Sequence, residues 1–294
     1  MSSNQQATVP AASARPAKAA ERRGNTAALL GSELLTLFRR RRTAALIGAL
    51  ALIPILIGVA VKIAGESSSG RGPAFLDLIT QNGLYVGLTA ITVATPLFLP
   101  LTIGVIAGDT IAGEASHGTL RYLLIAPAGR LRLLLVKYLS AGVFCLAASL
   151  TVLVVGTLVG WVLFSIGPLT LLSGTTVTVG EGLLRLLGIA AYISVSLLGL
   201  SAIGLFLSTL TTVPVGAMAG TAILAVAAQI LGALPQLDWL HPWLFTDHWL
   251  SFADLLRDPV QWASFGDNAL LQAGYIVVFG ALAAGRFLSK DILS

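Results

Sequence analysis

Residues 108–137 read GDTIAGEASHGTLRYLLIAPAGRLRLLLVK, a polar segment between two long apolar runs. A helix needs roughly 20 apolar residues to cross a bilayer, so a charged segment of this length between two such helices has to lie outside the hydrocarbon. The segment contains acidic and basic residues, a Gly-Thr pair and a proline. We interpret residues 108–137 as a surface on which another protein docks.

The composition indicates a membrane protein. Hydrophobic residues make up 56% of the 294 residues, charged residues only 11%, and the mean hydropathy is +0.88. Soluble domains carry about 25% charged residues. The single cysteine, Cys145, excludes an intramolecular disulfide and a cysteine-based metal site.

Six apolar runs are long enough to span a bilayer, and none of them contains Asp, Glu, Lys, Arg or His. The sequence therefore predicts an all-α integral membrane protein with spans at residues 44–61, 84–107, 138–166, 186–210, 213–234 and 269–285. Cytoplasmic loops are enriched in Lys and Arg. Most of the 18 Lys and Arg residues lie before the first run, within residues 108–137, or after the last run. We expect a multi-pass protein of the cell membrane with both termini cytoplasmic. The net charge of +5 then reflects topology and not nucleic-acid binding.

The region before the first span has two parts. Residues 1–25 are rich in Ala, Ser, Gln and Pro, which predicts a disordered cytoplasmic tail, and residues 26–294 then form one transmembrane domain. Residues 26–42 have apolar and polar faces at helical spacing, which predicts an amphipathic elbow helix in the membrane interface. Its end carries four candidate anchors to anionic headgroups, Arg39, Arg40, Arg41 and Arg42. Both a plain anchor and a moving elbow fit this pattern.

The spans contain signals of close packing and of kinks. Small residues at GxxxG spacing let helices approach, either within the chain or between subunits. Three such pairs occur: Gly83 and Gly87, Gly156 and Gly160, Gly216 and Gly220. Prolines at four positions predict kinks: Pro54, Pro96, Pro100 and Pro214. The polar groups available to line a path are Gln229, Gln272, Ser194, Ser196 and Ser201, although Ser in a span more often bonds its own helix.

The outer loop, residues 235–268, holds most of the 5 Trp residues. The pattern predicts short helices in the outer headgroup zone, with Trp239, Trp243, Trp249 and Trp262 as interface anchors. The loop also contains His241, Asp247, His248 and Asp254, so a metal or hydrolytic site is an alternative, although the spacing matches no zinc motif.

The sequence lacks the motifs of an enzyme or an independent pump. It has no GxxxxGK[ST], GxSxG or HExxH. Ion-coupled transporters carry charged or titratable residues inside the membrane, whereas the predicted spans have none. A protein of this kind either does not pump or takes its energy from a partner.

The polar segment resembles the first cytoplasmic loop of ABC-2 type transporter permeases. In that family the order is Glu, Gly-Thr, paired Leu, Pro, a basic residue and Lys. This chain has Ile111, Glu114, Gly118-Thr119-Leu120, Leu123-Leu124, Pro127, Arg130 and Lys137 in that order. The resemblance extends from Asn25 over the elbow helix, the six spans and the long outer segment. It departs from the family at Ala128-Gly129, where relatives often offer a Ser as helix cap.

The resemblance implies a permease subunit and not an enzyme. Two permease subunits, identical or different, would form the pathway, and separate ABC ATP-binding subunits would bind ATP and Mg; this chain itself would bind no cofactor. Membrane lipids are the other expected partners. Export of a hydrophobic or amphipathic substrate follows from the resemblance. A scaffold that recruits a soluble protein without transport is the alternative, and an intramembrane enzyme is a third.

In the resemblance, residues 108–137 are the coupling loop. Ser116 can cap a short coupling helix at residues 119–125, which Pro127 would end. Glu114 and Arg121 either pair to fix the loop or form a solvated surface pair. The expected partner-coupling residues are Glu114, Gly118, Thr119, Leu120, Arg121, Leu123, Leu124, Pro127, Arg130 and Lys137.

Overall fold

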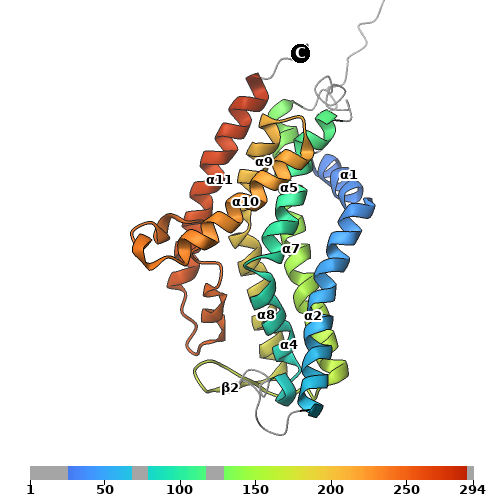
Figure 1. Cartoon of the computed structure of the whole chain (residues 1–294), viewed down its shortest axis with the longest axis vertical. Coiled ribbons are helices and arrows are strands. Elements are labelled where there is room, and N and C mark those ends of the chain that lie inside the picture. The colour runs from blue at the N-terminus through green and yellow to red at the C-terminus, as the bar shows by residue number, and fades with distance from the viewer. Residues whose placement is uncertain (1–25, 68–78, 117–128, 290–294) are drawn as a thin grey trace, which may run out of the picture.

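A computed structural model of the protein describes residues 26–67, 79–116 and 129–289 and shows a bundle of long helices (Figure 1). The long helices are α1 (Thr26–Arg39), α2 (Arg41–Ser67), α4 (Leu84–Ala94), α5 (Phe98–Ser116), α7 (Arg130–Leu163), α8 (Val179–Ser196), α9 (Leu198–Leu210), α10 (Pro214–Gly232) and α11 (Ala263–Ser289). A small antiparallel pair of strands, β1 (Leu169–Thr170) and β2 (Thr176–Val177), joins α7 to α8. Three 3-10 helices join α10 to α11: η1 (Pro235–Leu237), η2 (His241–Trp243) and η3 (Ser251–Leu256).

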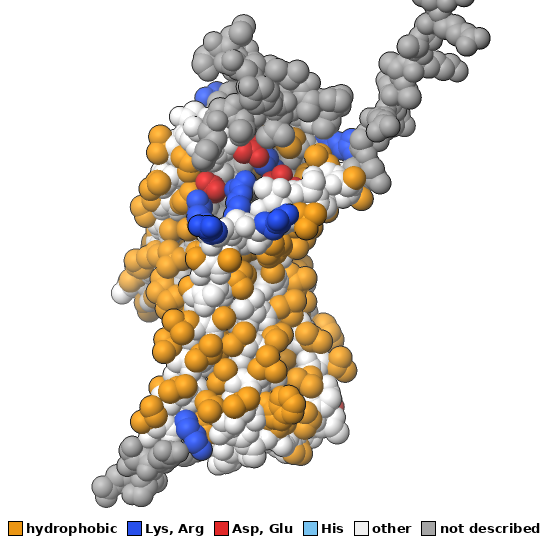
Figure 2. All heavy atoms as spheres, turned by 90° about the vertical axis from the view of Figure 1, so that its right-hand side faces the viewer, with side chains coloured by type: hydrophobic (Ala, Val, Ile, Leu, Met, Phe, Trp, Pro, Cys, Tyr) orange, Lys and Arg blue, Asp and Glu red, His pale blue; other side chains and the backbone are white. Residues whose placement is uncertain are grey.

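Six helical segments in the described residues are long and apolar enough to cross a membrane. They are Arg41–Ala64, Phe98–Ser116, Arg130–Leu163, Val179–Leu210, Pro214–Gly232 and Ala263–Ser289. The predicted class, an all-α membrane protein with six spanning helices, is confirmed. Figure 2 shows a band of hydrophobic side chains along the bundle, with charged side chains gathered above it near one end.

The helices are longer than the apolar runs that predicted them. α5 continues to Ser116 instead of ending at residue 107, and α7 begins at Arg130 instead of residue 138. Hydropathy marks only the part of a helix that matches the hydrocarbon, while the hydrogen-bonded backbone continues into polar sequence. Residues 108–116 and 130–137 are therefore helix ends and not loop. The predicted coupling helix at residues 119–125 and the predicted tail at residues 1–25 lie outside the described residues.

Two of the predicted spans are broken. The second, predicted at residues 84–107, consists of α4 and α5, and the break at residues 95–97 contains Pro96, which cannot donate a backbone hydrogen bond. The fourth, predicted at 186–210, begins earlier as α8 and breaks at Leu197 before α9. Pro54 lies inside α2 without ending it, and Pro214 begins α10.

Two of the three GxxxG pairs pack against each other within the chain. Added methyl groups at Gly83 and Gly160 would collide with the backbone of the other residue, and Gly156 has the same relation to Gly87. This contact lets α4 and α7 approach closely. An added methyl group at Gly216 meets nothing within 4 Å. The first two pairs therefore serve packing inside the subunit.

The outer loop folds back against α8 and α11. Trp249 Nε1 donates to the Ser196 carbonyl at 3.0 Å, and Gln272 Nε2 donates to the Phe245 carbonyl at 2.9 Å. Tyr192 donates its hydroxyl to the His248 carbonyl at 2.7 Å. These bonds hold the loop onto the helices.

Two predictions for this region are wrong. Trp249 is only 1% exposed, so it is a core residue and not an interface anchor. Its indole N–H finds a partner at the end of α8, which makes its burial favourable. Gln272 is also 1% exposed and holds the loop instead of lining a path. Trp239, Trp243 and Trp262 are exposed, and their role as anchors stays a prediction.

Candidate functional site

The site begins with the two helices that flank residues 117–128. α5 ends at Ser116, and α7 begins at Arg130 immediately after Gly129. Gly129 has a φ of 73°, in the left-handed region that glycine adopts without strain. α7 thus starts at a defined residue although Gly129 offers no side-chain cap. α5 and α7 pack against each other, so both ends of residues 117–128 lead into one packed unit.

An ionic cluster of Glu33, Glu114 and Lys137 joins α1, α5 and α7. Lys137 Nζ donates to Glu114 Oε1 at 2.5 Å and to Glu33 Oε1 at 3.0 Å. The Lys137 side chain is 1% exposed, and those of Glu114 and Glu33 are 15% and 26% exposed. A buried ammonium is tolerated only when it is paired and hydrogen-bonded. The cluster therefore fixes the position of α1 relative to the two helices beside residues 117–128.

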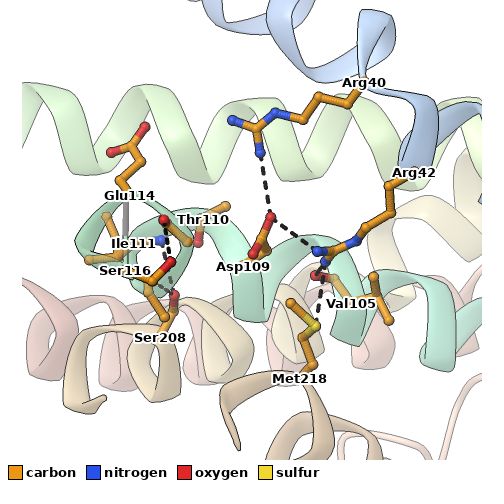
Figure 3. A network of polar contacts seen from close by, with 12 residues as sticks. Arg40, Arg42, Val105, Asp109, Thr110, Ile111, Glu114, Ser116, Ser208 and Met218 are labelled. Atoms are coloured by element: carbon orange, nitrogen blue, oxygen red, sulfur yellow. Dashed lines mark hydrogen bonds and ion pairs between the residues drawn. The ribbon is translucent and has the colours of Figure 1, made fainter. Parts of the chain in front are cut away.

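A second set of charges lies where α1 turns into α2. Arg40 and Arg42 both reach Asp109 Oδ2 of α5, each at 3.4 Å, as Figure 3 shows. Arg42 also donates to the Val105 carbonyl at 2.9 Å and approaches Met218 Sδ at 3.4 Å. The junction of α1 and α2 is thereby attached to α5 and, through Met218, to α10.

The loop-side end of α5 is also wedged between α9 and α10. The Ser208 hydroxyl of α9 accepts backbone N–H bonds from Ile111 at 2.9 Å and Ala112 at 2.8 Å (Figure 3). A Cβ on Gly108 would lie 2.7 Å from the Met218 nitrogen of α10, and one on Gly204 would lie 2.7 Å from the Ala107 Cβ. These contacts leave α5 little freedom to move independently of α9 and α10.

The structure brings only part of the predicted coupling set together. Glu114 and Lys137 are in direct contact, while Arg130 donates to the Leu288 carbonyl of α11 at 3.1 Å and so lies elsewhere. Seven of the predicted residues lie outside the described residues: Gly118, Thr119, Leu120, Arg121, Leu123, Leu124 and Pro127. The prediction of a Glu114–Arg121 pair therefore stays a prediction.

Of the four arginines predicted as membrane anchors, two turn toward the protein. All four are exposed, and Arg40 and Arg42 in addition contact Asp109. α1 also has protein neighbours, since Phe38 contacts Phe144 of α7 with ring centroids 6.3 Å apart.

The histidines of the outer loop do not form a shared site in the structure. His241 Nδ1 lies 3.6 Å from Asp238 Oδ1, and His241 Nε2 lies 3.2 Å from two backbone carbonyls. His248 Nε2 lies 3.6 Å from the neighbouring Asp247 Oδ2. No group of three or more His, Cys, Asp or Glu side chains with metal-binding geometry occurs in residues 26–67, 79–116 and 129–289.

Sequence reasoning missed Glu33 and Asp109 as site residues and missed the burial of Lys137. The predicted spans contain no charged residue, but Lys137, one residue before the third span, is buried inside the bundle. A signal was present in the sequence: Leu133, Leu134 and Lys137 share the helical spacing of the following apolar run. That spacing indicates that the helix starts before residue 138 and turns Lys137 toward its neighbours.

Comparison with curated proteins finds no match. A family model described as "Protein of unknown function (DUF2705)" matches residues 51–293. The match covers most of the chain, from inside α2 to beyond the end of α11. The chain belongs to this DUF2705 family.

Proposed function

We propose that this chain is the permease subunit of a transporter of the ABC-2 type, driven by ATP that a separate subunit hydrolyses. The ionic cluster is the observation that carries this proposal. A permease without a nucleotide site needs a rigid connection from the partner's docking surface to the membrane helices. Glu33, Glu114 and Lys137 form such a connection, because they join α1 to the helices on both sides of residues 117–128.

In the proposed mechanism the ATP-binding subunit docks on residues 117–128 at the cytoplasmic face. ATP binding brings two such subunits together and displaces that segment in each permease. The Glu114–Lys137 contact makes α5 and α7 move as a pair, and Glu33 carries α1 with them. Since Ser208 and Gly108 hold α5 against α9 and α10, the displacement passes on to those helices.

The apolar side chains that the described helices expose suit a hydrophobic or amphipathic substrate. Ser194 and Ser201 donate to carbonyls four residues earlier in their own helices, so they offer no free polar lining. Export as the direction and a second permease subunit are parts of the proposal that rest on the family resemblance.

The test is purification of the tagged chain from native membranes, followed by an ATPase assay and labelling with a photoreactive ATP analogue. We expect a labelled partner whose ATPase activity changes when Glu114→Gln or Lys137→Met weakens the connection. Glu181→Gln is the matched control, because Glu181 pairs with Arg185 in α8, outside the ionic cluster. If a partner is recovered without ATP labelling, the scaffold alternative replaces the transporter. If an ATPase is recovered but both variants leave its activity unchanged, the coupling role of the cluster is wrong.

A further inference from the structure

A cavity of about 450 Å³ lies between α1, α2, α5 and α7, beside the ionic cluster. Its charged lining residues are Glu33, Arg40, Arg42, Asp109, Glu114 and Lys137. Leu37, Ile106 and Ala141 supply apolar parts of the wall. A pocket with a few convergent polar groups on an apolar wall is the usual form of a ligand site.

The charges of the cavity are divided into two halves. In one half Arg40 and Arg42 share the carboxylate of Asp109, so two positive charges face one negative charge. In the other half Glu33 and Glu114 share the ammonium of Lys137. The first half reaches the surface, since the two arginine side chains are 45% and 42% exposed. The cavity thus has a net positive half at Arg40 and Arg42 and a net negative half at Glu33 and Glu114.

Apolar surface continues from the opening along α2 and α5. Ala45, Ala49 and Leu52 follow Arg42 at helical spacing on α2, and all three are exposed. On α5, Phe98 lies on the face of Asp109 and is 41% exposed. Figure 2 shows hydrophobic side chains directly below the basic ones. A ligand that fills the cavity therefore has room for an apolar tail beside a charged head.

We infer that the cavity binds the headgroup of a phospholipid with a primary ammonium, of the phosphatidylethanolamine class. The phosphate lies at Arg40 and Arg42, whose guanidinium groups match its geometry. The ammonium lies toward Glu33 and Glu114, where its three N–H donors find carboxylate oxygens. A choline headgroup lacks these donors, and a purely anionic headgroup meets repulsion from the acidic side. The inference holds whether or not the chain is a transporter.

Native mass spectrometry of the purified full chain in detergent tests the inference. The protein is titrated with short-chain phosphatidylethanolamine, phosphatidylcholine and phosphatidylglycerol, and with free phosphoethanolamine. We expect phosphatidylethanolamine to bind about tenfold more tightly than the other two lipids, the factor that one charge-assisted hydrogen bond supplies. Free phosphoethanolamine is expected to bind much more weakly, because it lacks the tail. Equal binding of the three lipids overturns the inference. Tight binding of free phosphoethanolamine would mean that the ligand is the free headgroup molecule and not a lipid.

Two variants locate the site. Arg40→Gln is expected to weaken the binding of all three lipids by the same factor, because it removes a contact with the phosphate that they share. Glu33→Gln is expected to weaken phosphatidylethanolamine binding more than phosphatidylcholine binding, and so to reduce the preference, because the ammonium loses a carboxylate acceptor that choline cannot use. Glu181→Gln, outside the cavity lining, is the control and keeps the preference. An unchanged preference in Glu33→Gln overturns the placement of the ammonium. If that variant does not fold, the competition among lipids on the unmodified protein still decides the question.

Discussion

Replacing Lys137 by Met tests whether the ionic cluster holds the helices together. Met is close to Lys in length and is apolar, so the substitution removes the ammonium with little loss of volume. The carboxylates of Glu33 and Glu114 would then lie together without the cation that separates them. Since Met cannot donate a hydrogen bond, the two carboxylates lose their shared donor and keep only the water that reaches the cavity they line.

Removing one partner of a buried ion pair costs about 3–5 kcal/mol, because it leaves an uncompensated charge. Glu114→Gln alone is expected to cost less, since Lys137 keeps the carboxylate of Glu33. In the double variant, which combines Lys137→Met with Glu114→Gln, the remaining carboxylate is that of Glu33, which is 26% exposed and partly hydrated. The double variant is therefore expected to be more stable than Lys137→Met alone, a non-additivity of about 1–3 kcal/mol.

The assay is equilibrium unfolding in mixed micelles, with the free energy of unfolding measured for the two single variants, the double variant and the unmodified protein. Glu181→Gln gives the scale of a pair whose carboxylate is 47% exposed, for which we expect about 1 kcal/mol or less. A loss of less than about 1 kcal/mol in the free energy of unfolding for Lys137→Met would refute the reasoning, because an ion pair of a solvent-exposed lysine contributes no more than that. Strict additivity of the two substitutions would refute the direct contact.

Three further substitutions test other parts of the structure. Trp249→Phe removes the donor to the Ser196 carbonyl, so we expect a loss of about 1–3 kcal/mol and faster cleavage of residues 235–262 in limited proteolysis. Gly160→Ala is expected to lower the thermal stability by separating α7 from α4, whereas Gly216→Ala, which has open space, leaves it unchanged; equal effects would contradict the packing. Asp109→Asn is expected to lower the free energy of unfolding at low salt by about 1 kcal/mol or less, because the arginine partners of Asp109 are exposed. Equilibrium unfolding at high salt should show no difference between the variant and the unmodified protein.

The number and class of the spans could be predicted because the bilayer imposes a minimum apolar length. Their ends could not, because hydropathy falls where charged residues appear even when the helix continues. For that reason the sequence predicts a loop at Glu114 and Lys137, although both lie on helices. The break at residues 95–97 had a signal in Pro96, and the break at Leu197 follows Ser194 and Ser196, whose hydroxyls bond carbonyls four residues earlier and so favour a bend.

Of the candidate site, the sequence identified Glu114 and Lys137 but not the contact between them. That contact depends on the rotation of α5 and α7 about their axes, which packing against α1 and α9 sets. Trp249 is a second residue whose environment could not be predicted from the sequence. Tryptophan is favoured both at a membrane interface and in a core where its N–H has a partner, so its identity alone does not separate the two environments.

The two broken spans have a mechanical consequence for any force applied at residues 117–128. Contacts at Ser208, Gly108 and Gly204 hold α5 against α9 and α10. The break at residues 95–97 separates α5 from α4, and the break at Leu197 separates α9 from α8. α4 is instead packed on α7 through paired glycines, and α8 is tied to the outer loop. Helices kink where the ladder of backbone hydrogen bonds is disturbed, so each break is a place where the span can bend. A displacement of α5 is therefore expected to move α7, its partner in the ionic cluster, together with α9 and α10, and α7, which is unbroken from Arg130 to Leu163, extends to the far end of the bundle.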